Sequence, residues 1–355
     1  MLVGIMIHPR LQPGRWGESA PFFQQLAEEG TDLGIRVVFF SPGMINWRKQ
    51  QMQGYRWESQ SEQWRVVTTG LPHVVYDRFF AYPGMPVAIH ACYQGLRKRR
   101  IPVFNPPLGN KYSNHCKLMR DPVIAPHLPA TQRWQPLKRW WQPLKRWNQV
   151  YIKPVNGTKG KGILRLTLRK KRAVLVESAA PPMYRKMSWS QMKMQMPKLL
   201  RGRTYIVQQG LQTARWDDKI FDIRVLWQRD RQGEWLVTGA AVRVGANGIT
   251  CNLHAGATAL PLDVVLEDAQ IAITTEEIHR LGKQIIMRLN RSTPLLGEVG
   301  LDFLIDQNQH LWFIEANSRP GRAIFNSMGD GEGRRCAVRR PLEYACYLAE
   351  RRKVR

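Results

Sequence analysis

The residues from Gly300 to Gly321 constrain the fold of this chain most strongly. They read GLDFLIDQNQHLWFIEANSRPG, in which two apolar runs flank a polar turn, a pattern typical of an antiparallel hairpin. If the turn centres on Asn308 and Gln309, Asp302 lies directly opposite Glu315. Glu315 and Asn317 are two residues apart, so they share one face of their strand. The pattern therefore predicts two carboxylates and an amide oxygen together on an otherwise apolar hairpin.

Such a cluster of oxygens indicates a metal site. Like charges placed opposite each other destabilise a hairpin unless a cation neutralises them. Carboxylate and amide oxygens suit Mg²⁺, which keeps several waters and usually bridges the phosphates of a substrate. We therefore predict Asp302, Glu315 and Asn317 as ligands of Mg²⁺ or Mn²⁺. The alternative is a solvated acidic pair at the edge of a hairpin.

A second motif follows Tyr151 and reads YIKPVNGTKGKGI. Lys153 closes a strand, and a glycine-rich loop precedes the next apolar run. Glycines let backbone N–H groups approach an anion, and the lysine adds a positive charge. This is no Walker A loop, because no Lys-Ser/Thr pair follows its last glycine, and an ordinary hairpin turn is the alternative. Together with a metal hairpin, the motif predicts phosphate binding by Lys153, Gly157, Thr158, Gly160 and Gly162.

The positive charge of the chain is concentrated in one segment. The chain has 54 Lys and Arg against 27 Asp and Glu, a formal net charge of +27. Residues 97–203 hold 26 of these basic residues and only two acidic ones, Asp121 and Glu177. Such a field attracts polyanions or anionic substrates, although solvated surface cations would give the same composition.

Composition also restricts the class of protein. Five cysteines stand singly, without CxxC pairs, which argues against a disulfide scaffold or a zinc site and fits a reducing cytosol. The apolar start MLVGIMI is too short for a signal core and is typical of a buried strand. No run of about 18 apolar residues occurs, so we expect no membrane span and a cytoplasmic location.

The hydrophobic pattern predicts an α/β protein. A strand over 2–7, a helix over 18–33 and a strand over 35–40 make a βαβ unit and so a parallel sheet. Further expected elements are strands at 74–76 and 103–104, strands on both sides of the glycine loop within 150–176, and helices over 184–200, 275–290 and 341–352. The methionines of 184–200 indicate core or an adaptable surface.

A tandem repeat, WQPLKRW twice over, occupies residues 134–147. Two copies are too few for a solenoid, and the prolines at 136 and 143 argue against a continuous helix. We interpret the repeat as a duplicated linker. The alternative is a tryptophan-and-cation patch that binds nucleic acid.

The metal hairpin and the glycine loop together resemble the ATP-grasp superfamily, and within it the endospore coat-associated YheC/YheD proteins, with motifs shared with RimK-type ligases. The resemblance covers about residues 113–330. It implies an ATP-grasp fold of two α+β lobes preceded by a small parallel-sheet domain. The implied division is 1–112 for the N-terminal domain, about 113–206 for a small basic lobe and about 207–355 for a large lobe.

The same resemblance implies roles for single residues. Asp302, Glu315 and Asn317 are the implied Mg²⁺ ligands. The implied nucleotide-binding residues are Lys117 and Lys153 on the phosphates, Gln208, Gln209, Gly210 and Leu211 in the hinge that reads adenine, and Asp222 and Asn252 near the nucleotide. Arg224 and Arg243 are the implied catalytic arginines. Asp222 and Arg224 as a structural ion pair, and Arg243 as a surface cation, are the alternatives.

The resemblance implies an ATP- and Mg²⁺-dependent carboxylate–amine ligase, associated with the spore coat, that works through an acyl phosphate. Ala257, Thr250 and the glutamines of the hinge depart from the RimK-like pattern, which leaves the acceptor chemistry open. Two alternatives remain, a non-catalytic ATP-binding coat protein and a cationic protein that binds nucleic acid. The implied partners are ATP, an anionic or carboxylate substrate, and coat proteins or an acidic polymer.

Overall fold

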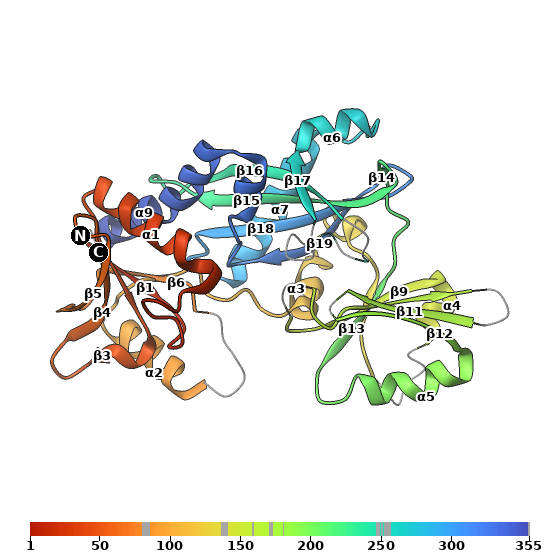
Figure 1. Cartoon of the computed structure of the whole chain (residues 1–355), viewed down its shortest axis with the longest axis horizontal. Helices are drawn as coiled ribbons and strands as arrows, with labels where there is room; N and C mark the ends of the chain where they lie inside the picture. The colour runs from red at the N-terminus through yellow and green to blue at the C-terminus, as the bar shows by residue number, and fades with distance from the viewer. Residues whose placement is uncertain are drawn as a thin grey trace.

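The computed structural model describes residues 1–79, 86–135, 141–157, 160–169, 173–179, 181–245, 249, 251 and 257–353. Within these residues the chain forms three β-sheets, one of seven strands and two of six (Figure 1). The first sheet lies in the N-terminal part, the second contains the glycine-loop strands, and the third contains the predicted metal hairpin.

The first sheet has the order β3-β4-β2-β1-β6-β7, with β5 paired to β4. Helix α1 connects β1 to β2, and these two strands pair in parallel, which confirms the βαβ prediction. The bounds are β1 Leu2–Met6, α1 Ala20–Asp32, β2 Arg36–Phe40, β3 Ile45–Asn46, β4 Gln51–Glu58, β5 Gln63–Gly70, β6 Val74–Asp77 and β7 Val103–Phe104. The β4–β5 hairpin was not predicted, because the residues of β5 are mostly exposed and show no clear apolar alternation.

Helices from both ends of the chain cover one face of this sheet. The C-terminal helix α9 (Gly331–Lys353) packs beside α1, as Figure 1 shows, and buries Leu342 and Ala345 against the sheet. Helix α2 (Pro86–Lys98) covers the other face. We predicted the C-terminal helix from Pro341 only, but this proline lies inside a helix that begins at Gly331.

The second sheet is antiparallel and has the order β12-β11-β10-β9-β13-β8. Its strands are β8 Thr131–Arg133, β9 Gln149–Pro154, β10 Leu164–Leu168, β11 Ala173–Ala179, β12 Pro182–Ser188 and β13 Tyr205–Gln209. The boundary expected between residues 206 and 207 falls inside β13. Helix α5 (Trp189–Leu199) packs on this sheet and buries Met192 and Met196, so these methionines are core residues.

Two predictions for this sheet were wrong. The helix expected over 184–200 begins only at Trp189, where Ser188 and Gln191 form a capping box. The preceding residues pair with β11 as strand β12, and this tertiary pairing overrides their helical spacing. The second WQPLKRW copy is no linker but forms helix α4 (Gln142–Trp147), with Leu144 buried in the core of the sheet. Residues 136–140 of the first copy lie outside the described part.

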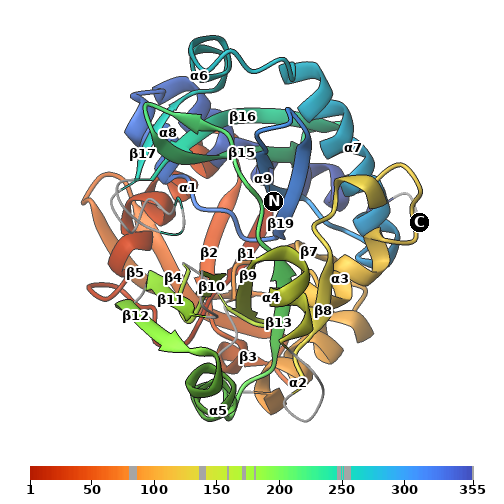
Figure 2. The same ribbon diagram turned by 90° about the vertical axis from the view of Figure 1, so that its right-hand side faces the viewer.

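The third sheet has the order β17-β16-β15-β18-β19, with β14 paired to β15. Its strands are β14 Arg215–Trp216, β15 Lys219–Arg229, β16 Trp235–Val244, β17 Thr258–Pro261, β18 Glu298–Ile305 and β19 Leu311–Asn317. Helix α7 (Thr275–Ser292) covers the face that bears Val225 and Leu301, while α8 (Ala323–Met328) packs on the other face (Figure 2). Helices α3 (Lys111–Leu118) and α6 (Leu262–Asp268) complete this part.

Candidate functional site

The predicted hairpin forms between β18 and β19, and it places Asp302 directly opposite Glu315. Gly300 lies opposite Asn317, so the three predicted ligands share one face at the same end of the hairpin. The predicted register fails toward the turn, where Phe303 pairs with Phe313 and not with Ile314. A β-bulge at this point adds one residue to β19 and restores the expected pairing at the carboxylates.

Charged side chains continue from this hairpin across the sheet. On β15, Arg224 lies opposite Asp302 of β18, and Asp222 lies opposite Arg243 of β16. Residues opposite each other in neighbouring antiparallel strands project from the same face. Arg243, Asp222, Arg224, Asp302 and Glu315 therefore form one row over four strands, and we call these five residues the charged row.

Arginine–carboxylate pairs hold the centre of the charged row. Arg243 donates from Nε and Nη2 to the two carboxylate oxygens of Asp222, at 2.6 and 2.7 Å, and its Nη2 lies 3.1 Å from Asp302 Oδ2. Arg224 binds both oxygens of Asp302. Arg243 is only 6% exposed, so the alternative of a surface cation is wrong. The structure pairs Asp222 with Arg243 and Arg224 with Asp302, in place of the alternative ion pair between Asp222 and Arg224.

A lysine from helix α3 completes the row at Glu315. Lys111 binds this carboxylate, and Asn317 donates from Nδ2 to its Oε1 at 3.1 Å. The predicted phosphate lysine, Lys117, lies elsewhere, because its Nζ donates to Ser292 Oγ on α7 at 3.0 Å. Six residues turn a helix by about 600°, so the two lysines leave α3 in different directions. The structure thus brings Lys111 to the cluster, and Lys117 remains apart from it.

The sequence held a signal for Lys111 that we did not use. Asn110 caps the helix by accepting a hydrogen bond from the Ser113 N–H at 2.8 Å. An asparagine at this position is typical of an N-cap, so it predicts that a helix begins at Lys111 and that Lys111 lies in its first turn.

Lys153 belongs to the second sheet, and its charge interacts with Glu315, Asp302 and Asp222 of the charged row. It lies on β9, and its Nζ donates to Gln208 Oε1 at 2.6 Å. Burial lowers the pKa of Lys153 to about 8, and the nearby carboxylate of Glu315 only partly offsets this effect. A lysine with so low a pKa beside carboxylates is typical of a functional site.

The predicted hinge begins at Gln208, which accepts the hydrogen bond from Lys153, and continues along the end of β13. Gln209 accepts a hydrogen bond from the Ala130 N–H through Oε1 at 3.3 Å, and the Gly210 N–H donates to Gln149 O at 3.0 Å. A Cβ at Gly210 would lie 2.6 Å from the side chain of Gln149, so this close approach requires glycine. Leu211 follows directly, outside the strand. The hinge therefore connects the second sheet to the third, while its contact with adenine stays a prediction.

The glycine loop joins β9 to β10, the two strands predicted on its flanks, and these strands pair antiparallel as a hairpin. Gly160 and Gly162 have φ angles of 73° and 74°, a left-handed conformation that favours glycine. Gly157 approaches Pro154 closely, since a Cβ there would lie 3.3 Å from the proline Cβ. Two predicted site residues, Thr158 of this loop and Asn252, lie outside the described residues.

The electrostatics of the charged row follow from burial and pairing. Burial raises the pKa of Asp222 to about 6, although the Arg243 guanidinium opposes this shift. Burial also acts to raise the pKa of Glu315, but Lys111 and Lys153 outweigh it and hold that pKa well below its usual range. Glu315 therefore stays ionised and attracts cations.

The residues of the hairpin fit a divalent cation of the Mg²⁺ type. In the part of the chain that the structure describes, no three Asp, Glu, His or Cys side chains gather to hold a metal. A cation on Asp302 and Glu315 would therefore need the amide oxygen of Asn317 and oxygens from outside the protein, which is how Mg²⁺ is usually bound. The ammonium of Lys111 against Glu315 indicates that a positive charge is stable at this position.

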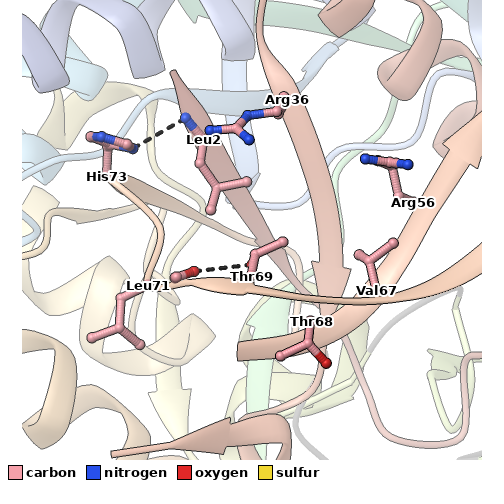
Figure 3. Close-up of a pocket in the computed structure, with 9 residues that line it drawn as sticks. Leu2, Arg36, Arg56, Val67, Thr68, Thr69, Leu71 and His73 are labelled. Atoms are coloured by element: carbon pink, nitrogen blue, oxygen red, sulfur yellow. Dashed lines mark hydrogen bonds between the residues drawn. The ribbon is translucent and has the colours of Figure 1, made fainter. Parts of the chain in front are cut away.

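A pocket of about 460 Å³ lies elsewhere, on the first sheet (Figure 3). Arg36, Arg56 and His73 are among its lining residues, and the Leu2 N–H donates to His73 Nδ1 at 3.1 Å. No residue of the charged row lines it. The pocket and the charged row are thus separate features.

The second sheet carries Lys153 and the glycine loop, and the third sheet carries the hairpin with Asp302 and Glu315. This combination defines a protein of the ATP-grasp class. A sequence model described as YheC/D-like ATP-grasp matches residues 100–348. The chain belongs to this family. The endospore coat-associated protein YheD of Bacillus subtilis (strain 168) is 30% identical over 346 residues, which are 93% of this chain and 74% of YheD.

Two solved structures show the same fold at low sequence identity. D-alanyl-alanine synthetase A from Vibrio cholerae O1 biovar eltor has a TM-score of 0.58 and 14% identity, with 99% of each chain covered. The ATP-grasp ligase PsnB, complexed with its minimal precursor, Mg and ADP, has a TM-score of 0.54 and 13% identity, with 99% of this chain and 98% of PsnB covered. Both confirm the predicted mixed α+β ATP-grasp fold. Among the described residues, no helix is long and apolar enough to span a membrane.

Proposed function

We propose that this protein is an ATP-dependent ligase that joins a carboxylate to an amine through an acyl phosphate. The charged row carries the proposal, because it places three carboxylates and two arginines on one sheet face. Lys111 binds its Glu315 end, and the half-buried Lys153 lies close enough for its charge to interact with Glu315. Sites for phosphoryl transfer need this combination of cation ligands and positive charges.

In this proposal the binding residues come from both sheets. Lys153 and Lys111 hold the phosphates, the loop with Gly157, Gly160 and Gly162 covers them, and the β13 hinge contacts adenine. Lys111 takes the role first assigned to Lys117, because its ammonium lies at Glu315. A Mg²⁺ ion held by Asp302, Glu315 and Asn317 would supply charge neutralisation on the phosphates.

The proposed chemistry has two steps. A carboxylate oxygen of the substrate attacks the γ-phosphorus of ATP, and the bond from that phosphorus to ADP breaks. The amine then attacks the carbonyl carbon and loses a proton, while inorganic phosphate leaves with the bonding electrons. In this proposal Arg224 and Arg243 stabilise the negative charge of the transferred phosphate. The contacts of Arg224 with Asp302 and of Arg243 with Asp222, which fix the orientation of both guanidinium groups, support it.

A second candidate is an ATP-binding coat protein without catalysis. The two-point contact of Arg224 with Asp302 favours it, because this arginine engages both oxygens of a predicted metal ligand. For either function we propose synthesis in the cytoplasm and association with the spore coat, by analogy with the coat-associated YheD. Turnover separates the two candidates.

The test is calorimetry of ATP binding with and without Mg²⁺. We expect Mg²⁺-dependent binding by the wild type and its loss in Glu315→Ala, because this change removes a predicted cation ligand. The control is Glu350→Ala, an exposed glutamate paired only with Arg231 in the described structure, which should bind as the wild type does. Catalysis is then measured as the release of inorganic phosphate when different carboxylates and amines are added with ATP. Equal ATP binding by Glu315→Ala and the wild type would contradict the proposed site.

A further inference from the structure

The second sheet ends in an open strand, and this edge carries the next inference. Strand β12 is the last in the order of its sheet, and among the described residues β11 is its one pairing partner. Figure 1 shows it at the outer side of the sheet, next to α5. It is seven residues long, against three for β8 at the opposite edge. A long open edge can pair with an added strand.

The hydrogen-bond pattern shows which amides of β12 face outward. The Arg169 N–H donates to Ala173 O, so Ala173 turns its backbone groups toward β10. Backbone groups alternate in direction along a strand, so Val174 and Val176 turn theirs toward β12. Their partners, Met187 and Arg185, must then face β11.

This alternation leaves the N–H groups of Tyr184 and Lys186 pointing away from the sheet. Ser188 lies two residues after Lys186, so its N–H also points away from β11. This N–H indeed donates to the side chain of Gln191 at 2.8 Å. An extended chain that lies along β12 would thus find two outward N–H donors and the carbonyl groups of the same residues.

The side chains of this edge determine the charge of its partner. Lys186 projects from one face of the sheet and Arg185 from the other, and both are exposed. Tyr184 is 73% exposed and can cover apolar parts of an added strand. The one glutamate on the neighbouring strand, Glu177 opposite Tyr184, is already bound by Arg165 at 2.7 and 2.8 Å. The edge is therefore cationic on both faces.

We infer that β12 binds an extended acidic polypeptide segment by strand addition. The charge of residues 97–203, with 26 basic and two acidic residues, attracts such a partner from solution, and the open amides then fix it in register. Lysine on an edge strand also prevents aggregation between sheets, but that function needs no exposed tyrosine beside it. The inference concerns binding alone and does not depend on ATP chemistry.

The first test measures binding of a fluorescent ten-residue peptide of alternating Glu and Val to the full chain by anisotropy, with a Lys–Val peptide as control. We expect only the acidic peptide to bind. Lys186→Glu should weaken it about fivefold or more, because attraction becomes repulsion. Lys198→Glu, the same charge change on the exposed side of α5, should have less than about half that effect. Equal losses in both variants, or no binding of the acidic peptide, would overturn the inference.

The second test separates strand addition from nonspecific charge attraction. Hydrogen exchange over residues 182–188 should slow at the amides of Tyr184 and Lys186 when the acidic peptide binds. Tyr184→Pro removes one outward N–H without breaking a bond to β11, and it should weaken binding about tenfold while the unfolding temperature stays near that of the wild type. Unchanged exchange, or tighter binding of a single-stranded oligonucleotide than of the peptide, would contradict a polypeptide partner.

Discussion

Single substitutions of two lysines of helix α3 test which lysine belongs to the ATP site. Lys111 binds Glu315, whereas Lys117 donates to Ser292, away from the charged row. We expect Lys111→Ala to weaken ATP binding about tenfold or more, since a charge-assisted contact to phosphate contributes about 1.5–3 kcal/mol. Lys117→Ala removes the same charge from the same helix and should bind ATP like the wild type. Calorimetry in the presence of Mg²⁺ measures both, and a larger loss in Lys117→Ala would restore the family-based assignment.

The lowered pKa of Lys153 predicts a dependence of ATP binding on pH. Phosphates bind the charged ammonium, so ATP affinity should fall as the pH rises through about 8, by up to about tenfold per pH unit. Stability should change in the opposite sense. The unfolded chain, with an ordinary lysine pKa, binds more protons between pH 8 and 10.5, so this group makes the free energy of unfolding rise with pH there.

Lys153→Arg is the matched variant for this pH dependence. Arginine stays protonated over the whole range, so the variant should bind ATP with an affinity that is flat from pH 7 to 10. Binding titrations at half-unit steps would show the difference. A wild type as flat as the variant would mean that Lys153 does not contact the phosphates in its charged form.

These residues also show what the sequence could reveal about the site. The pairing of Asp302 with Glu315 follows from one hairpin, whose two strands are close in sequence. The pairing of Asp222 with Arg243 was not predicted, because it depends on the register between β15 and β16. A strand pattern gives the face of each residue and leaves its partner on the next strand open.

At the scale of elements, the register of the β18–β19 hairpin was predicted correctly at Asp302 and Glu315 through two errors that cancel. The turn centres on Asn308, whereas we expected its centre between Asn308 and Gln309. The bulge near Phe303 then shifts the register by one residue. Apolar alternation has a period of two and does not indicate where an extra residue is inserted. Bulges often lie next to active sites, where they redirect side chains, and this one aligns Asp302 with Glu315.

The glycine loop gives a prediction for an element. Gly157 and Gly162 would both place a Cβ near Pro154, at 3.3 and 3.2 Å, but only Gly162 has a positive φ. We expect Gly162→Ala to cost about 1–2 kcal/mol of unfolding free energy, because alanine is strained in this conformation. Gly157→Ala, with the same added methyl group, should cost less. Urea unfolding measures both, and equal losses would indicate that the contact with Pro154, and not φ, requires glycine.

At the scale of the whole molecule, a buried ion network joins the first sheet to the third. Glu298 of β18 is fully buried and binds Tyr76 of β6, Arg78 at 3.0 Å, Gln228 and Arg322. Burial acts to raise the pKa of Glu298, but Arg322 and Arg78 outweigh it. Tyr76 and Arg78 are more than 200 residues away from Glu298 in the sequence, so no local pattern could have predicted their contacts with it.

The C-terminal helix makes the N-terminal part dependent on the rest of the chain. Helix α9 contributes seven buried residues to the core of the first sheet, namely Val338, Leu342, Tyr344, Ala345, Cys346, Leu348 and Ala349. The expected N-terminal domain of residues 1–112 lacks this helix and would expose one face of its sheet to water. Without α9 the fragment buries less apolar surface, and this burial is what offsets the loss of conformational entropy on folding.

We therefore expect the fragment 1–112 to be collapsed or aggregated, with secondary structure but without cooperative unfolding. The same fragment joined by a flexible linker to residues 331–353 should regain a sigmoidal urea transition, because α9 again covers the face that packs α1. A matched control carries Leu342→Asp in the added helix, which places a charge in the core and should abolish the gain. Cooperative unfolding of 1–112 alone would mean that α1 suffices to cover this face, and that α9 only ties the two ends of the chain together.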